Sequence, residues 1–176
     1  MDKKIKKKTR KTRKKKSIQH HHLLLRIETK KCPEEFDKEA MSVMLYDLVK
    51  DICMKPLGKQ EVFYVKTPKN NEGLTAIQVI ETSHIAFHFW KNPEKNILHS
   101  KGKCLLQMDV YTCSSLSSKQ IAIILNEISR FEPTHANITL LNRKWSLTIE
   151  RQDTWSSSES NKNSSWSKWV SERFNS

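Results

Sequence analysis

Two runs of alternating apolar and polar residues, joined by a loop, constrain the fold of this chain more than any other feature. In residues 80–90 the apolar positions Ile85, Phe87 and Phe89 alternate with more polar ones, and residues 106–113 continue the same period. A period of two is typical of a strand that buries one face. The intervening residues are rich in turn formers, so the two runs are predicted to pair as an antiparallel hairpin.

The hairpin carries three residue types that are used in catalysis. If the two strands pair, we expect Ser83, His88 and Cys113 to gather at one end of a sheet. A hydroxyl, an imidazole and a thiol are the parts of a nucleophile and acid–base site. Taken singly, each residue also suits an ordinary role as a turn serine, a half-buried histidine or a buried strand cysteine. Their joint spacing is what indicates chemistry.

The remaining patterns predict two amphipathic helices and further strands. The helical stripes are Met41, Met44, Leu45, Leu48, Val49 and Ile52, and then Ile121, Ile124, Leu125, Ile128 and Phe131. Ser117 and Gln120 have the spacing of a capping box before the second helix. Strands are predicted over residues 21–29, 61–66, 74–81, 136–141 and 145–149. With about six strands, the predicted fold is α+β, a two-layer sandwich of an antiparallel sheet covered by two helices.

The motif order around the hairpin resembles the short, bacterial and archaeal type of S-adenosylmethionine decarboxylase. The matching features are Ser83-His84, then His88 after three intervening residues, an aromatic pair, and then Asp-Val-Tyr-Thr-Cys at 109–113. Thr75, eight residues before the serine, extends the match upstream. The resemblance covers roughly residues 20 to 150, and the order of its predicted elements agrees with the fold of that family.

The resemblance implies that the chain cuts its own backbone between Thr82 and Ser83. The serine hydroxyl would attack the preceding carbonyl, and elimination and hydrolysis would leave a pyruvoyl group on residue 83. Thr75 and His88 correspond to the family's processing residues, the hydroxyl holding the oxyanion and the imidazole moving protons. The pyruvoyl ketone would form a Schiff base with the substrate amine and accept the electrons released with CO₂. Cys113 would then return a proton to the α-carbon.

The same resemblance implies a substrate, a cofactor and an assembly. The expected substrate is S-adenosylmethionine, decarboxylated to supply aminopropyl groups for polyamine (spermidine) biosynthesis. The expected cofactor is the pyruvoyl group that the chain makes from Ser83. Members of the short type build their sites across a dimer, so a homodimer of processed protomers is expected.

Several positions depart from the family pattern. Thr82 stands where the family usually has glutamate, and Leu74, Ala76 and Ser114 stand where it usually has glycine. Lost glycines remove backbone freedom where chains approach closely. An alternative hypothesis is therefore a catalytically inactive relative that acts as a binding subunit.

Charge divides the chain unevenly and suggests a second alternative. Of the formal net charge of +13, residues 1–16 carry +10, from eleven Lys/Arg and one Asp, which leaves +3 for the rest. We expect residues 1–18 to form a basic, disordered tail, followed by the decarboxylase-like domain at 19–151 and a Ser/Trp-rich tail at 152–176. Residues 3–16 could bind nucleic acid or a ribosome electrostatically, act as a nuclear import signal, or simply aid solubility.

The spacing of apolar residues in the C-terminal tail predicts a short helix. Trp166, Trp169, Val170 and Phe174 are spaced as a one-sided apolar stripe. Packing back onto the domain is the simpler expectation, and recognition of a partner protein is the other.

Cysteine usage and hydropathy bear on location. The four cysteines form no CxxC pair and are too sparse for a disulfide scaffold, so a reduced, cytoplasmic protein is expected. No apolar run approaches the length of a membrane helix, and the basic start lacks the apolar segment of a signal peptide. His20-His21-His22 alternate between the faces of a strand, so no metal site is predicted there.

Overall fold

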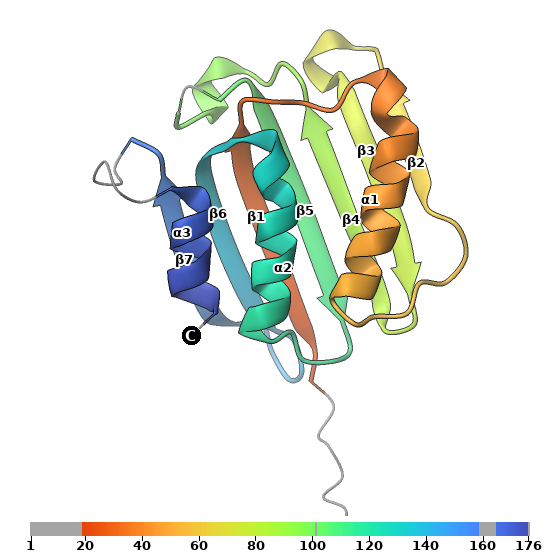
Figure 1. Ribbon diagram of the computed structural model, residues 1–176, viewed down its shortest axis with the longest axis vertical. Coiled ribbons are helices and arrows are strands. Elements are labelled where there is room, and N and C mark those ends of the chain that lie inside the picture. Colours follow the sequence, from red (N-terminus) through yellow and green to blue (C-terminus); the bar gives the residue numbers. More distant parts are fainter. Residues whose placement is uncertain (1–18, 101, 159–164, 176) are drawn as a thin grey trace, which may run out of the picture.

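Seven antiparallel strands form one sheet in the order β2-β3-β4-β5-β1-β6-β7 (Figure 1). The computed structural model describes residues 19–100, 102–158 and 165–175. The strands are β1 (His21–Thr29), β2 (Glu61–Val65), β3 (Gly73–Ile80), β4 (Ser83–Trp90), β5 (Cys104–Thr112), β6 (Pro133–Asn142) and β7 (Thr148–Ser156). The helices are α1 (Lys38–Asp51), α2 (Ser118–Ile128) and α3 (Trp166–Phe174), with short 3-10 turns η1 (Glu35–Asp37), η2 (Lys69–Asn71), η3 (Lys95–Ile97) and η4 (Ser129–Phe131). The predicted α+β sandwich is confirmed, with a third helix added to its helical layer.

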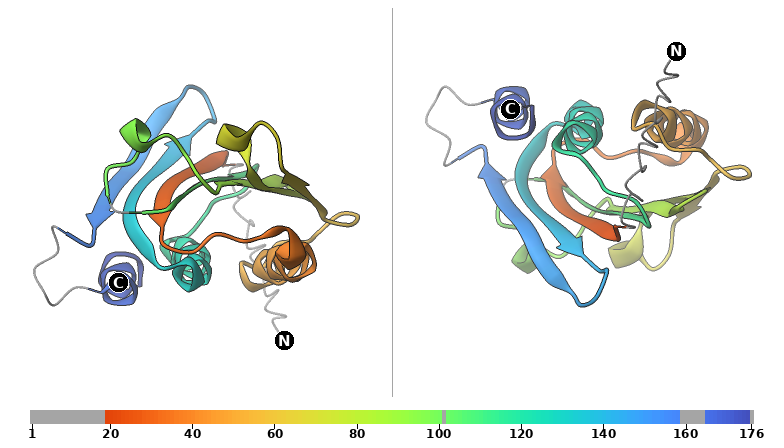
Figure 2. Two further views of the ribbon diagram at one scale, coloured as in Figure 1. Left: turned by 90° about the horizontal axis from the view of Figure 1, so that it is seen from above. Right: turned by 90° about the horizontal axis from the view of Figure 1, so that it is seen from below.

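Among the described residues the α-helices α1, α2 and α3 all lie on one face of the sheet, and the short turns η2 and η3 lie toward the other face (Figure 2). We call this second face the open face. Alternate strand residues such as Leu23, Leu25 and Ile27 of β1 are buried under the helices. Their neighbours point to the opposite face, as the pleat of a strand requires. That open face carries the exposed apolar side chains of Phe63 and Val79. In the part of the chain that the structure describes, no α-helix therefore covers this second sheet surface.

The strand β7 differs from its prediction. It begins at Thr148 and continues to Ser156, so the domain boundary predicted at residue 151 falls inside a strand. Trp145, which was predicted to start this strand, lies in the preceding turn and is 89% exposed. The apolar period is weak here because a buried position is occupied by the polar Asp153.

The helix α3 packs back onto the domain, as the apolar stripe predicted. Trp166, Val170 and Phe174 are buried, and the Trp166 indole donates a hydrogen bond to the Leu125 carbonyl at 3.0 Å. The ring of Trp166 also lies 5.1 Å, between centroids, from that of Trp155 on β7. Residues of the predicted C-terminal tail thus extend the fold at the β7 edge.

Asp153 holds α3 against β7, and removing its carboxylate should destabilise the folded protein. Arg151 and Arg173 each donate to its buried carboxylate at 2.5 Å, which ties β7 to α3. We expect Asp153→Ala to lower the free energy of unfolding by about 3 kcal/mol, because two arginines lose a buried partner. Chemical denaturation followed by tryptophan fluorescence measures this loss. Glu172→Gln on the exposed side of α3 is the control and should change stability by less than about 0.5 kcal/mol; an equal loss in both variants would contradict the account.

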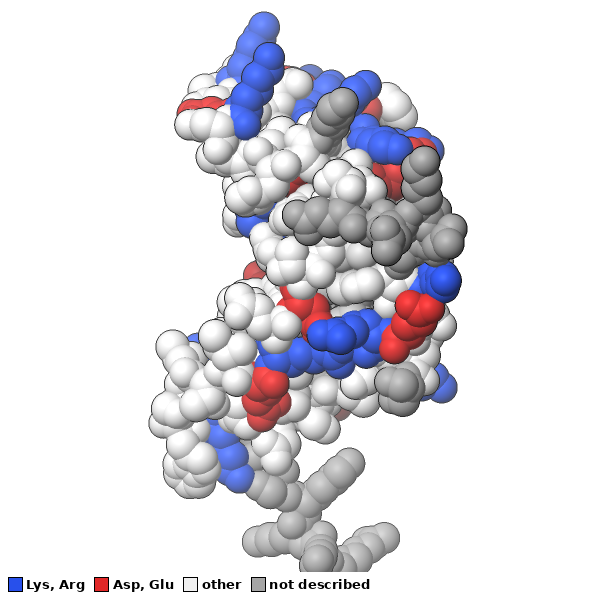
Figure 3. All heavy atoms as spheres, turned by 90° about the vertical axis from the view of Figure 1, so that its left-hand side faces the viewer, with Lys and Arg blue, Asp and Glu red and all other residues white. Residues whose placement is uncertain are grey.

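The charges on this edge of the molecule are mixed. In Figure 3, which views the side formed by β7 and α3, basic and acidic side chains lie next to one another. The strongly basic residues 1–16 lie outside the described residues, so the predictions on nucleic-acid binding and nuclear import fall there. Within the described ranges, no helix combines the length and apolar character needed to span a bilayer.

The cysteines correct one expectation from the sequence. Cys32 and Cys104 form a disulfide with a Cα–Cα distance of 5.9 Å, so the prediction that all four are reduced thiols is wrong. They are 72 residues apart in sequence. The two residues meet because Cys32 follows β1 and Cys104 begins the neighbouring strand β5, where it pairs with Thr29. Cys53 and Cys113 are free and exposed.

Candidate functional site

The turn from β3 to β4 brings the Thr82–Ser83 bond beside the end of β5. Ser83 is paired with Thr112 in the β4–β5 register, so Cys113 lies next to this bond. The Cys113 backbone N–H donates to the Thr82 carbonyl at 3.0 Å, and the Thr112 hydroxyl donates to the Thr82 hydroxyl at 2.9 Å. The structure thus brings together Ser83 and Cys113, as the sequence predicted, with a hydrogen-bond donor on the carbonyl between them.

Ser83 has an irregular backbone. Its φ is +150°, a conformation that residues other than glycine rarely adopt. Such a conformation costs about 1–3 kcal/mol and is concentrated at functional sites. In a regular strand Ser83 and His84 would point to opposite faces, yet here the Ser83 hydroxyl lies 3.2 Å from His84 Nδ1. The strain is therefore located at the bond where cleavage was predicted.

His84 in turn contacts a carboxylate. Its Nε2 lies 3.0 Å from Asp109 Oδ2, and His22 Nε2 lies 3.4 Å from the same oxygen. Burial alone would raise the pKa of Asp109, but the hydrogen bonds and electrostatic interactions with His22 and His84 hold this pKa below its usual range. Asp109 is therefore ionised at neutral pH.

Thr75 and His88 form a second polar pair on the open face. They are register partners on β3 and β4, and the threonine hydroxyl hydrogen-bonds to His88 Nδ1. Burial lowers the pKa of His88, so its imidazole is neutral at neutral pH and able to accept a proton. The ring also stands edge-on to Trp90, with 4.4 Å between centroids.

The structure does not place His88 with Ser83 in one chain. His88 is paired with Gln107, five residues along β4 from the Ser83–Thr112 pair. At a rise of roughly 3.3 Å per residue, five residues of strand span about 16 Å. The expectation that Ser83, His88 and Cys113 gather at one end of a sheet is therefore wrong for His88.

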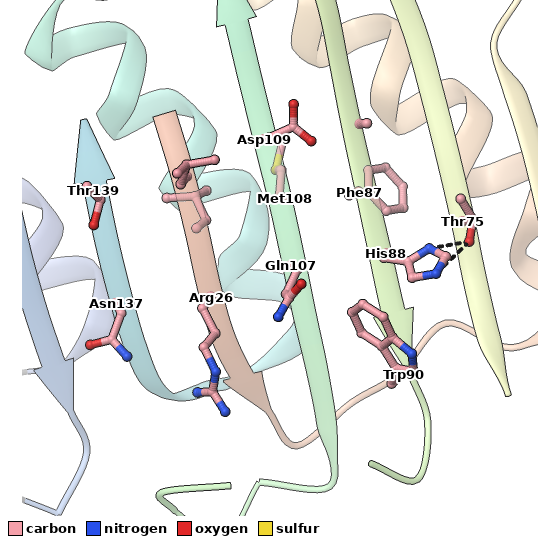
Figure 4. Close-up of a pocket in the computed structure, with 13 residues that line it drawn as sticks. Arg26, Thr75, Phe87, His88, Trp90, Gln107, Met108, Asp109, Asn137 and Thr139 are labelled. Carbon is pink, nitrogen blue, oxygen red and sulfur yellow. Dashed lines mark hydrogen bonds between the residues drawn. The ribbon is translucent and has the colours of Figure 1, made fainter. Parts of the chain in front are cut away.

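A hollow of about 570 Å³ lies over the open face and contains the Thr75–His88 pair (Figure 4). Arg26, Gln107 and Asn137 from the neighbouring strands line the same hollow. A second hollow, of about 260 Å³, lies beside Thr82 at the cleavage end. The larger hollow offers a cation, two amides and a neutral imidazole to a polar ligand.

Glu28 anchors the loop between β4 and β5, which gives a pH-dependent prediction. Its fully buried carboxylate accepts the backbone N–H groups of His99 and Ser100 at 2.6 and 2.7 Å and contacts Arg26 Nη1 at 3.1 Å. Burial alone would raise the pKa of Glu28, but these hydrogen bonds hold it below the ordinary value of 4.5.

A lowered pKa means that this stabilisation is present above pH 4.5 and is lost as the pH falls through the pKa of the folded state. Glu28→Gln should therefore lower the free energy of unfolding by about 2–3 kcal/mol at pH 7. Chemical denaturation at pH 7 and at pH 3 should show the difference from wild type shrinking in acid. A difference that is the same at both values would contradict the assignment.

The residues that depart from the family pattern fit the fold. Leu74 and Ala76 point into the core, where they are 0% and 1% exposed. The glycine that the hairpin requires is Gly73, where a Cβ would collide with the Phe89 carbonyl oxygen. Ser114 donates its backbone N–H to the Thr112 hydroxyl at 3.1 Å. These substitutions therefore leave the backbone at the site intact.

His84 and Asp109 are site residues that the sequence analysis did not select. Alternation places both on the open face, but their contact requires the β4–β5 register, which pairs Asp109 with Ala86. Among the described residues no group of His, Cys, Asp and Glu side chains is arranged to hold a metal ion.

Comparison with known families identifies the family to which the chain belongs. The family model for S-adenosylmethionine decarboxylase matches residues 22–144, which include Thr75, Ser83, His88 and Cys113. Comparison with curated proteins gives no match. The matched region contains both polar groups and most of the sheet, from β1 through β6. The chain therefore belongs to the S-adenosylmethionine decarboxylase family.

Proposed function

We propose that this protein is a pyruvoyl-dependent decarboxylase of S-adenosylmethionine that makes its own cofactor by cleavage before Ser83. The observation that carries the proposal is the strained Ser83 backbone. The Ser83 hydroxyl lies beside the His84 imidazole, and the scissile Thr82 carbonyl accepts a hydrogen bond from the Cys113 N–H. A pyruvoyl group at this position supplies an electron sink for the decarboxylation of a substrate amine. The product would be an aminopropyl donor for polyamine biosynthesis.

The proposed assembly is a homodimer with sites shared between the protomers. Ser83 with Cys113 and Thr75 with His88 are two half-sites, about 16 Å apart along β4. A two-fold axis through the open sheet face would place each half-site against the other half-site of the partner. Exposed apolar side chains on that face, including Phe63, would be covered in the same step.

The residues of the chain have distinct tasks in this proposal. The Cys113 N–H stabilises the negative charge that develops on the Thr82 carbonyl during cleavage. His88, neutral and hydrogen-bonded to Thr75, removes the α-proton of the partner's Ser83. In turnover the Cys113 thiol protonates the α-carbon after CO₂ leaves, and the hollow around Arg26 and Asn137 holds polar parts of the substrate.

Cys113→Ala separates turnover from cleavage. The variant keeps the backbone N–H at residue 113, so the chain should still be cut before Ser83. Steady-state turnover should fall by about 10²–10⁴-fold, the usual effect of losing an acid–base group. Cys53→Ala, which removes the other free thiol, is the control and should leave turnover unchanged. A Cys113→Ala protein with wild-type turnover would remove the thiol from the site.

Release of labelled CO₂ from carboxyl-labelled S-adenosylmethionine tests the activity itself. The purified, cleaved protein should release label in proportion to the amount of cleaved chain, and Ser83→Ala protein should release none. Cleaved protein that binds no S-adenosylmethionine and releases no label would contradict the proposed substrate.

A further inference from the structure

Ser83, His84 and Asp109 form a continuous polar chain at the cleavage bond. The Ser83 hydroxyl lies 3.2 Å from His84 Nδ1, and His84 Nε2 lies 3.0 Å from the Asp109 carboxylate. A bond to a carboxylate requires a proton on Nε2, which leaves the Nδ1 lone pair of a neutral imidazole facing the hydroxyl. A nucleophile, a base and an orienting carboxylate in this order make an activated hydroxyl.

The surroundings keep this arrangement in place. The His84 ring meets Tyr111 edge-on, with 6.0 Å between centroids, and the guanidinium of Arg143 lies over the same tyrosine ring at 4.4 Å. His22 contacts the Asp109 carboxylate from β1. The titratable and charged groups facing His84 are therefore Asp109 and Tyr111 on β5, with His22 and Arg143 behind them.

We propose that His84 is the proton acceptor for Ser83 in the first step of cleavage, and that Asp109 is its positioning residue. This inference rests on the proposed function. Ser83 Oγ forms a bond to the Thr82 carbonyl carbon while its proton moves to His84 Nδ1. The Thr82–Ser83 C–N bond then breaks, and the same proton passes to the Ser83 nitrogen. The amide becomes an ester with a free amine, and no other reactant is consumed.

This assignment divides the two proton transfers of cleavage between two histidines. His84 is adjacent to the nucleophile in its own chain, so it acts on the hydroxyl. His88 lies about 16 Å along the strand and reaches Ser83 only from a partner, where it acts on the α-proton in the later elimination. Variants that lack one or the other histidine should therefore stop at different chemical stages of cleavage.

Hydroxylamine distinguishes those stages because it cuts an ester at neutral pH and leaves an amide intact. His84→Gln protein should remain full-length, cleave about 10²–10⁴-fold more slowly and give no fragments with hydroxylamine. His88→Ala protein should accumulate the ester and be cut by hydroxylamine between residues 82 and 83. Asp109→Asn should slow cleavage and extend the active pH range to lower pH, because removing the carboxylate disfavours the charged His84 imidazole. A merely structural role of Asp109 would not shift this pH profile of cleavage.

The controls keep the outcome specific. The matched control is His99→Gln. The His99 ring lies beside His135, on the loop between β4 and β5, and this variant should be cleaved at close to the wild-type rate. Circular dichroism confirms that each variant is folded. A His84→Gln protein that cleaves at the wild-type rate, that accumulates a hydroxylamine-sensitive ester, or that is no slower than His99→Gln would overturn the inference alone. An uncut wild-type chain would overturn the proposed function with it.

Discussion

Ser83→Ala should abolish cleavage completely, leaving a full-length chain under every condition of incubation. Alanine supplies no hydroxyl to attack the Thr82 carbonyl, and no neighbouring group can substitute because the hydroxyl must be part of the scissile residue. Denaturing gel electrophoresis and mass spectrometry after long incubation measure the effect.

The matched control for this variant is Ser114→Ala. Ser114 lies at the same end of the sheet, but only its backbone N–H contacts the site, through the Thr112 hydroxyl. It should be cut at close to the wild-type rate. Cleavage of the Ser83→Ala chain between residues 82 and 83 would show that the serine hydroxyl is not the nucleophile.

Mixed dimers should restore the cleavage that each of two single variants lacks. His88→Ala protein retains Ser83, and Ser83→Ala protein retains His88, so neither is expected to complete cleavage as a homodimer. When the two chains are co-expressed, a mixed dimer contains one complete shared site. About half of the His88→Ala chains should then be cut, if protomers assort at random into two-fold dimers.

This result depends on the separation of the half-sites along β4. If Ser83 and His88 acted within one chain, co-expression would give no more cleavage than either variant alone, and the shared site would be refuted. Size-exclusion chromatography with light scattering supplies the independent check, because a monomer at working concentration would also contradict the model.

Much of the fold could be predicted because its strands alternate cleanly. Ile85, Phe87 and Phe89 are all buried, and the hairpin with β5 forms in the predicted place. The continuation of β7 could not be predicted from hydropathy because a buried position holds Asp153, whose charge is compensated by arginines from two elements. The disulfide was missed for a related reason, since strand order and not sequence spacing brings Cys32 to Cys104.

The candidate site could be predicted in its parts but not in its arrangement. Ser83 and Cys113 are joined by the hairpin register, which the sequence specifies. Sequence spacing alone suggests that His88 lies with them, because it is only five residues from Ser83. An extended strand nevertheless separates the two residues by about 16 Å. His84 was overlooked because a regular strand would turn it away from Ser83, and the positive φ that reverses this is not visible in the sequence.

The intact mass of the purified wild-type protein, measured under denaturing conditions, tests the central claim most directly. Self-cleavage predicts two chains, residues 1–82 and 83–176, with the second chain lacking a free amino terminus because residue 83 has become a pyruvoyl group. Reduction before the measurement is required, because the disulfide between Cys32 and Cys104 would otherwise hold the two chains together. A single chain of full-length mass after long incubation would contradict the account and favour an inactive relative that acts by binding.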